Sequence, residues 1–139
     1  MSWVRLPLVV LMGITLIYDA YSLTVRGMTS PRAWVQSGTA SWYGREEQGR
    51  PTADGETFNR HEFTAASRHL PFNTVVRVTH EKNGRSVQVR INDRGPFVKG
   101  RILDLSEAAA GTLDMKQSGT APVKIEVVQP ASAKAIESP

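Results

Sequence analysis

Two runs in the middle of the chain, residues 75–79 and 86–91, place a branched apolar side chain at every second position. Alternation with a period of two is typical of a strand with one buried face, and it strongly constrains the fold. Asn83-Gly84 lies between the runs and predicts a hairpin with a type I′ turn, because that turn needs positive φ at both positions. The buried face expected from these runs and a later one comprises Val76, Val78, Val87, Val89, Ile91 and Ile125.

The other predicted elements are also short. Residues 39–43 and 123–128 are further predicted strands. Two brief helices are expected, one over residues 59–62 with Asn59 as its N-cap, and one that starts at Ser106 and ends at Gly111. Short strands interrupted by brief helices indicate a mainly β fold. In a chain of 139 residues, we expect a small β-barrel.

The first 22 residues have the pattern of a secretory signal. Arg5 precedes an apolar run over residues 6–18, and the small residues Ala20 and Ser22 mark a candidate cleavage site. The run is short for a membrane span, which needs about 20 apolar residues. We therefore expect a signal peptide over residues 1–22, with an uncleaved anchor or a buried first helix of a cytosolic domain as the alternatives.

The rest of the chain divides by composition. Residues 23–37 lack clear periodicity and are expected to be a linker, and residues 38–128 are expected to form the barrel domain. Residues 129–139 are small, polar and proline-flanked, which predicts a disordered tail. The expected product is a monomer in the periplasm or cell envelope.

Charge and cysteine content exclude several functions. The net charge of +4 favours anionic surroundings, but the Lys and Arg are scattered, so no nucleic-acid partner is expected. Without cysteine there is no thiol for a lipid anchor, a thiolate metal site or a nucleophile. His61, His69 and His80 lie far apart without the spacing of paired ligands, so neither a metal nor another cofactor is expected.

Two carboxylates stand where short apolar runs end. Asp93 follows the run over residues 86–91, the chain then turns at Gly95-Pro96, and a second apolar run carries Asp104. An acid at the end of a buried strand has a rigid support and still reaches solvent, as a catalytic carboxylate must. The pair indicates either chemistry on a glycosidic bond or a structural ion-pair network with neighbouring arginines. Those arginines are Arg90, Arg94 and Arg101.

A series of motifs in this order resembles the double-psi β-barrel domain of the rare lipoprotein A (RlpA) family. The motifs are Ala40-Ser41-Trp42-Tyr43-Gly44, Thr52-Ala53-Asp54-Gly55-Glu56, Thr64-Ala65-Ala66, Leu70-Pro71-Phe72, Val76-Arg77-Val78-Thr79, Asn83-Gly84-Arg85-Ser86-Val87, Ile91-Asn92-Asp93-Arg94-Gly95-Pro96-Phe97 and Arg101-Ile102-Leu103-Asp104-Leu105-Ser106. The resemblance implies a six-stranded double-psi barrel related to expansin and barwin domains. It also implies an exported peptidoglycan lytic transglycosylase that prefers glycan strands without stem peptides and serves daughter-cell separation at the septal ring.

The resemblance also implies roles for three carboxylates. Asp93 matches the family's catalytic aspartate, and we expect it to act as acid and base. Glu56 matches a second functional carboxylate that stabilises charge or positions sugar, and Asp104 resembles the expansin-type aspartate that shares the acid role. Structural alternatives exist for each. In these alternatives, Asp93 only pairs with Arg94 or Arg101, and Glu56 is only a solvated loop residue. Asp104 would then cap the helix that starts at Ser106 or form an ion pair with Arg101.

Four further residues are candidates for substrate binding. Trp42 and Tyr43 form either a sugar-stacking platform or part of the core, and Ser67 and Arg94 complete the set. The expected partners are peptidoglycan glycan strands, with divisome or other envelope proteins as candidates.

The chain departs from the family at three positions. Ser67 stands where the family often has histidine, Asn59 replaces an aspartate, and Gln48 stands where a histidine is frequent. A hydroxyl carries no charge, so a histidine contribution to the site is lost or has moved, for example to His69. The alternative function is therefore a non-catalytic, expansin-like glycan-binding module.

Overall fold

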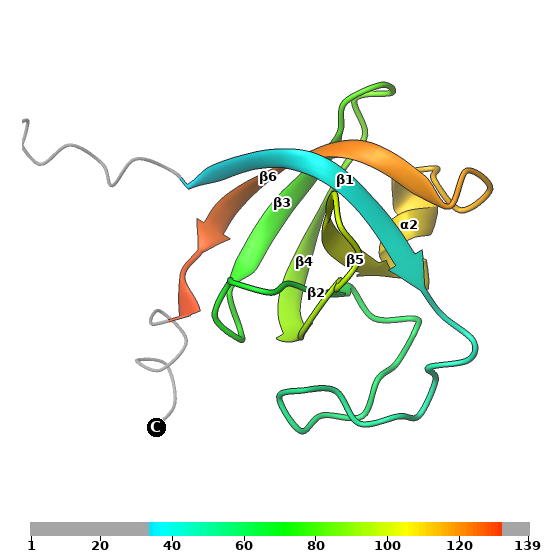
Figure 1. Ribbon diagram of the computed structural model, residues 1–139, viewed down its shortest axis with the longest axis vertical. Coiled ribbons are helices and arrows are strands. Elements are labelled where there is room, and N and C mark those ends of the chain that lie inside the picture. Colours follow the sequence, from blue (N-terminus) through cyan, green and yellow to red (C-terminus); the bar gives the residue numbers. More distant parts are fainter. Residues whose placement is uncertain (1–33, 132–139) are drawn as a thin grey trace, which may run out of the picture. The chain divides into compact units, whose positions relative to one another are not determined.

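The computed structural model describes residues 34–131, which form six strands and one short helix (Figure 1). The strands are β1 (Val35–Tyr43), β2 (Thr64–Ala66), β3 (Val75–His80), β4 (Ser86–Asp93), β5 (Arg101–Ser106) and β6 (Thr120–Gln129), and the helix is α2 (Glu107–Thr112). The predicted signal peptide, most of the linker and most of the tail lie outside the described residues. Within residues 34–131, no helix has the length and hydropathy needed to cross a membrane.

The strands close into a barrel in the order β1-β5-β2-β4-β3-β6. β1 pairs with β5 and β2 with β4 in parallel, whereas the other neighbours are antiparallel. Parallel neighbours need crossover connections, and here these are the long loop between β1 and β2 and the segments that flank β5. The six-stranded barrel predicted from the family resemblance is confirmed.

The predicted apolar face lines the barrel interior. Val76, Val78, Val89, Ile91 and Ile125 are all buried, and Val87 is half-buried against them. The register explains this arrangement, because Val76 lies opposite Val89 on β4 and Val127 on β6. Neighbouring strands thus direct their apolar positions to the same side.

The hairpin between β3 and β4 is confirmed, but the predicted type I′ turn is wrong. Only Gly84 of the pair has positive φ, at 74°. The last ladder bond runs from His80 N–H to the Arg85 carbonyl, so the loop is longer than two residues. Nδ1 of His80 accepts from the N–H groups of Lys82 and Asn83, which stabilises this longer loop.

The two predicted helices have different outcomes. Ser106 caps α2 as expected, because its Oγ accepts from Ala109 N–H at 3.3 Å. The helix predicted over residues 59–62 is wrong, since this segment is a turn. Asn59 Oδ1 accepts from His61 N–H, and the Asn59 carbonyl accepts from Glu62 N–H. The side chain of Asn favours such local turns as readily as a helix start.

Candidate active site

A pocket of about 300 Å³ opens where β1, β2 and β4 end. Tyr43, Ala66 and Asp93 are the last residues of β1, β2 and β4. Asp104 lies within β5. Strand pairing brings these positions together, because Ala66 lies opposite Asp93 in the parallel pair β2–β4 and opposite Asp104 in the antiparallel pair β2–β5. The remaining lining residues are Glu47, Arg50, Pro51, Phe58 and Arg94.

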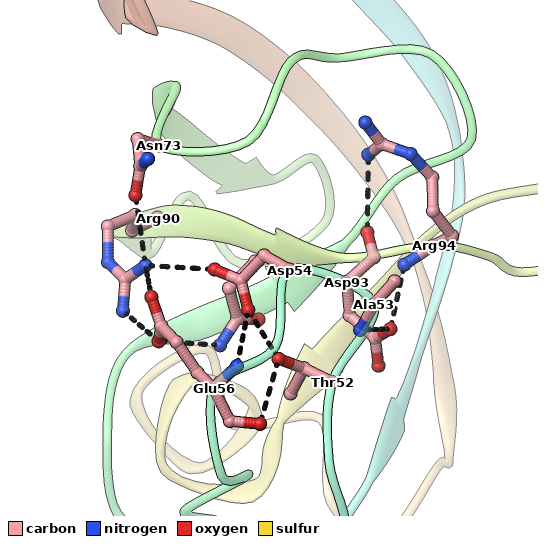
Figure 2. A network of polar contacts seen from close by, with 9 residues as sticks. Thr52, Ala53, Asp54, Glu56, Asn73, Arg90, Asp93 and Arg94 are labelled. Carbon is pink, nitrogen blue, oxygen red and sulfur yellow. Dashed lines mark hydrogen bonds and ion pairs between the residues drawn. The ribbon is translucent and has the colours of Figure 1, made fainter.

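Asp93 is held at the pocket by backbone donors. Its Oδ1 accepts from Ala53 N–H and from Arg94 N–H, both at 2.9 Å (Figure 2). Among residues 34–131, no group donates to its Oδ2, and no ion pair joins Asp93 to Arg94 or Arg101. One oxygen is thus anchored and the other is available to a ligand.

Asp104 lines the same pocket, and no arginine of residues 34–131 forms an ion pair with it. Its Oδ1 accepts from the hydroxyl of Ser41 on β1. It neither caps α2, which Ser106 does, nor forms an ion pair with Arg101 within the described part of the chain. The structural alternatives for Asp93 and Asp104 are therefore absent from residues 34–131.

Tyr43 forms part of the pocket wall. Its ring stacks on Phe58 with centroids 4.6 Å apart, and its hydroxyl is buried without a hydrogen-bond partner in the described residues. Burial raises the pKa of Tyr43 well above its usual range, and the negative charges of Asp93 and Asp104 raise it further. Tyr43 therefore stays a neutral hydroxyl beside two carboxylates.

Arg94 reaches the pocket but uses much of its guanidinium on the protein. Its Nη1 donates to the carbonyls of Ser67 and Leu70 at 3.0 and 2.9 Å, and the group lies 3.8 Å from the Phe72 ring centroid. Ser67 is buried and does not line the pocket, since its Oγ accepts from the N–H groups of His69 and Leu70. The hydrogen bonds of Arg94 and Ser67 thus hold the backbone of the segment that follows β2.

Glu56 does not line the pocket that contains Asp93. Its two carboxylate oxygens accept from Nη1 and Nη2 of Arg90 at 2.6 and 2.7 Å, and Asp54 lies 3.8 Å from the same guanidinium (Figure 2). The hydrogen bonds from Arg90 lower the pKa of Glu56 from 4.5 to about 2. The expected ion-pair network thus exists around Arg90, and it leaves Asp93 and Asp104 out.

Trp42 points away from the site that Tyr43 lines. Its Nε1 donates to the Lys116 carbonyl, and the Lys116 ammonium lies 5.7 Å from its ring centroid. The half-buried ring packs against the core, as the structural alternative for Trp42 required. No cluster of three or more His, Asp or Glu suited to a metal ion occurs in residues 34–131.

Sequence reasoning did not single out several residues at the pocket. Glu47, Arg50 and Phe58 come from the long loop between β1 and β2, where no periodic pattern marks them. Phe97 is 82% exposed, and a methyl group added at Gly95 would lie 3.7 Å from its ring and 3.9 Å from Asp104 Oδ2. The sequence signal that could have identified Phe97 was an aromatic residue directly after the turn at Gly95-Pro96, beside Asp93.

The chain matches one protein-family model over most of the described residues. A family model described as "Lytic transglycolase" matches residues 35–125. The RlpA endolytic peptidoglycan transglycosylase of Campylobacter jejuni is 55% identical over 91 residues, which are 66% of this chain and 33% of that protein. The corresponding protein of Pseudomonas aeruginosa is 48% identical over 113 residues, or 81% of this chain and 33% of its own.

A probable RlpA transglycosylase from Nostoc is 62% identical over 93 residues, which are 66% of this chain and 25% of that protein. The chain therefore spans only a quarter to a third of these three relatives' length. Among solved structures, the Streptomyces papain inhibitor has a TM-score of 0.58 at 21% identity, covering 71% of this chain and 98% of its own. An apo expansin from Clavibacter michiganensis has a TM-score of 0.55 at 25% identity, with 70% and 52% covered.

Proposed function

Because the chain belongs to the lytic transglycolase family of double-psi β-barrel domains, we propose that it cleaves peptidoglycan glycan strands as a lytic transglycosylase. The observation that carries this proposal is the pair of carboxylates, Asp93 and Asp104, that line one pocket and form no ion pair with an arginine of residues 34–131. The substrate bond is the β-1,4 linkage between N-acetylmuramic acid and N-acetylglucosamine. The product carries a 1,6-anhydromuramoyl end.

Asp93 is the acid and then the base of this reaction. Its Oδ2 delivers a proton to the leaving glycosidic oxygen as the bond from that oxygen to C1 breaks. The muramoyl C6 hydroxyl then forms the new bond to C1, and the Asp93 carboxylate takes the proton that this hydroxyl releases. No water is consumed, and the carboxyl returns to its starting state.

The N–H groups of Ala53 and Arg94 are aimed at the charge that this step creates. As Asp93 gives up its proton, negative charge develops on its carboxyl group, and Oδ1 already accepts from both donors. Donors fixed in place before the reaction stabilise such charge without reorganisation. Asp104 keeps its negative charge near the sugar and stabilises the oxocarbenium-like transition state.

The surroundings of the pocket suit a sugar chain. The nearly fully exposed ring of Phe97, close to Asp104 across Gly95, offers an apolar face for a pyranose ring to stack on. The neutral Tyr43 ring forms part of the wall.

The location that corresponds to this function is the cell envelope, which the protein would reach by export through residues 1–22. Divisome or other envelope proteins are the candidate partners.

Mass spectrometry of glycan strands digested by the purified protein tests this proposal. Strands without stem peptides should give 1,6-anhydromuramoyl ends with wild-type protein and none with Asp93→Asn, which keeps the shape of the side chain but delivers no proton. A positioned acid is worth about 10²–10⁴-fold in rate, so the loss should be clear. Asp104→Asn should slow the reaction without abolishing it.

The alternative function gives a different result in the same assay. If wild-type protein binds strands and releases no anhydro sugar, the barrel is a non-catalytic glycan-binding module. If Asp104→Asn abolishes the products while Asp93→Asn retains them, the acid assigned here is wrong.

A further inference from the structure

The loop over residues 50–58 forms a small rigid unit beside the pocket. Pro51 and Thr57 form an isolated antiparallel bridge, and Thr52 N–H donates to the Glu56 carbonyl at 2.8 Å. At its tip, Gly55 N–H donates to the Thr52 carbonyl, which closes a turn of four residues with Ala53 second. Positions in this loop are therefore fixed relative to one another.

Asp54 adds a second layer of bonds inside the same loop. Its Oδ1 accepts from the Thr52 hydroxyl at 2.5 Å and from Glu56 N–H at 3.1 Å. The Glu56 side chain and the Ala53 N–H group thus belong to one hydrogen-bonded unit (Figure 2). A movement of one carries the other with it.

Two sets of contacts attach this unit to β4. On one side, Glu56 accepts two hydrogen bonds from Arg90 and one, at 3.5 Å, from Asn92 Nδ2. On the other side, Ala53 N–H donates to Asp93 Oδ1, and Asp54 N–H donates to the Asn92 carbonyl at 3.3 Å. The ion pair is the strongest of these attachments, because both partners are charged and the geometry is bidentate.

The engaged carboxylate of Glu56 is poorly suited to touching substrate. Both of its oxygens accept from Arg90, and Glu56 is not among the residues that line the pocket. Its pKa, lowered to about 2, keeps it ionised at pH values near neutrality. It therefore has no proton to give at those pH values.

We propose that Glu56 is a positioning residue, whose ion pair with Arg90 fixes the loop on β4 and so holds the Ala53 N–H group on Asp93 Oδ1. This inference rests on the proposed function of Asp93 as the acid. It replaces the role in charge stabilisation or direct sugar contact that the sequence implied for Glu56. The effect on the reaction passes through Ala53 and Asp93.

Separate substitutions of the two partners distinguish positioning from direct action. Arg90→Leu leaves the Glu56 carboxylate intact and removes what holds it, whereas Glu56→Ala removes the carboxylate itself. If Glu56 acts only through the pair, each variant should lower kcat by a similar factor, about 10- to 100-fold for a lost charge-assisted contact. The double variant should then be no slower than either single one.

A third variant removes the proposed donor directly. Ala53→Pro deletes the N–H group at the second position of a turn, where proline is well tolerated. It should reproduce the kinetic defect while the Glu56–Arg90 pair stays intact. Glu126→Gln is the matched control, because Glu126 pairs with Arg77 and Lys124 on the barrel wall, away from the pocket, and it should behave as wild type.

The pH dependence provides a readout that a merely structural role would not change. An N–H donor favours the ionised carboxyl, so its loss in all three variants should move the alkaline limb of the pH–rate profile to higher pH. The charged or titratable groups that share the pocket with Asp93 are Tyr43, Glu47, Arg50, Arg94 and Asp104, and none of them is altered.

NMR titration of the Asp93 carboxyl measures the effect of the lost donor directly and does not require enzymatic activity. A midpoint that moves upward in Glu56→Ala, Arg90→Leu and Ala53→Pro, with melting temperatures showing that each variant is folded, would support positioning. An unmoved midpoint, or an Arg90→Leu variant as active as wild type, would overturn it. If wild-type protein releases no anhydro sugar, the proposed function fails, and the titration still decides the positioning role.

Discussion

The ion pair between Glu56 and Arg90 makes an acid-dependent contribution to stability that can be measured by Glu56→Gln. Glutamine keeps the length of the side chain and one acceptor but removes the charge. In the folded protein the pKa of Glu56 is lowered from 4.5 to about 2 by its hydrogen bonds to Arg90. Folding therefore favours the ionised form, and its stabilisation is complete above about pH 4.5 and lost as the pH falls toward 2.

The size of this contribution follows from the pKa and the exposure. Each tenfold change in proton affinity is worth about 1.36 kcal/mol. Lowering the pKa of Glu56 from 4.5 to about 2 therefore adds at most about 3.4 kcal/mol to the free energy of unfolding. The side chain of Glu56 is 39% exposed, and solvent screens a charge pair at such a site. We therefore expect about 1 kcal/mol of unfolding free energy at neutral pH.

Urea unfolding of wild type and Glu56→Gln at pH 7, 5, 4, 3 and 2 measures this difference. It should be constant between pH 7 and 5 and shrink steadily below that range. In an Arg90→Leu background the same substitution should have little pH-dependent effect, because the partner is absent. A wild-type-to-variant difference that stays the same from pH 7 to pH 2 would refute the reasoning.

Four further outcomes are expected. Val89→Asp should unfold the domain, seen as loss of a cooperative thermal transition, because it buries an unpaired charge at a cost of several kcal/mol. Ser67→Ala should cost about 1 kcal/mol in urea unfolding, since two backbone N–H groups lose their acceptor. Phe97→Ala should weaken binding of glycan strands by about 5- to 10-fold in calorimetry. Phe63→Ala should not, because this half-exposed residue precedes β2 and so lies at the opposite end of that strand from the pocket residue Ala66. N-terminal sequencing of the mature protein should start after residue 22, and an intact start in the cytoplasm would contradict export.

The local pattern of the sequence predicted four of the six strands, β1, β3, β4 and β6, and missed the short β2 and β5. The alternation in β3 and β4 identified their buried face because the period of two is a property of the strand itself. Ser106 likewise marked the start of α2, since a cap acts within one turn of chain. Asn83-Gly84 marked a hairpin but not its turn, because bonds to the His80 side chain stabilise a longer loop than the dipeptide requires.

Asp93 and Asp104 stand out in the sequence as acids at the ends of apolar runs, but only the pairing of both their strands with β2 places them in one pocket with Tyr43. The same holds for Glu56, whose motif suggested a functional carboxylate. Its partner Arg90 is 34 positions away and becomes a neighbour only when the loop folds onto β4. Residue types and local spacing therefore determined which groups can do chemistry here. The tertiary structure decided which of them face the pocket and which hold it in shape, because contacts between distant segments depend on strand register and leave no periodic signal in the chain.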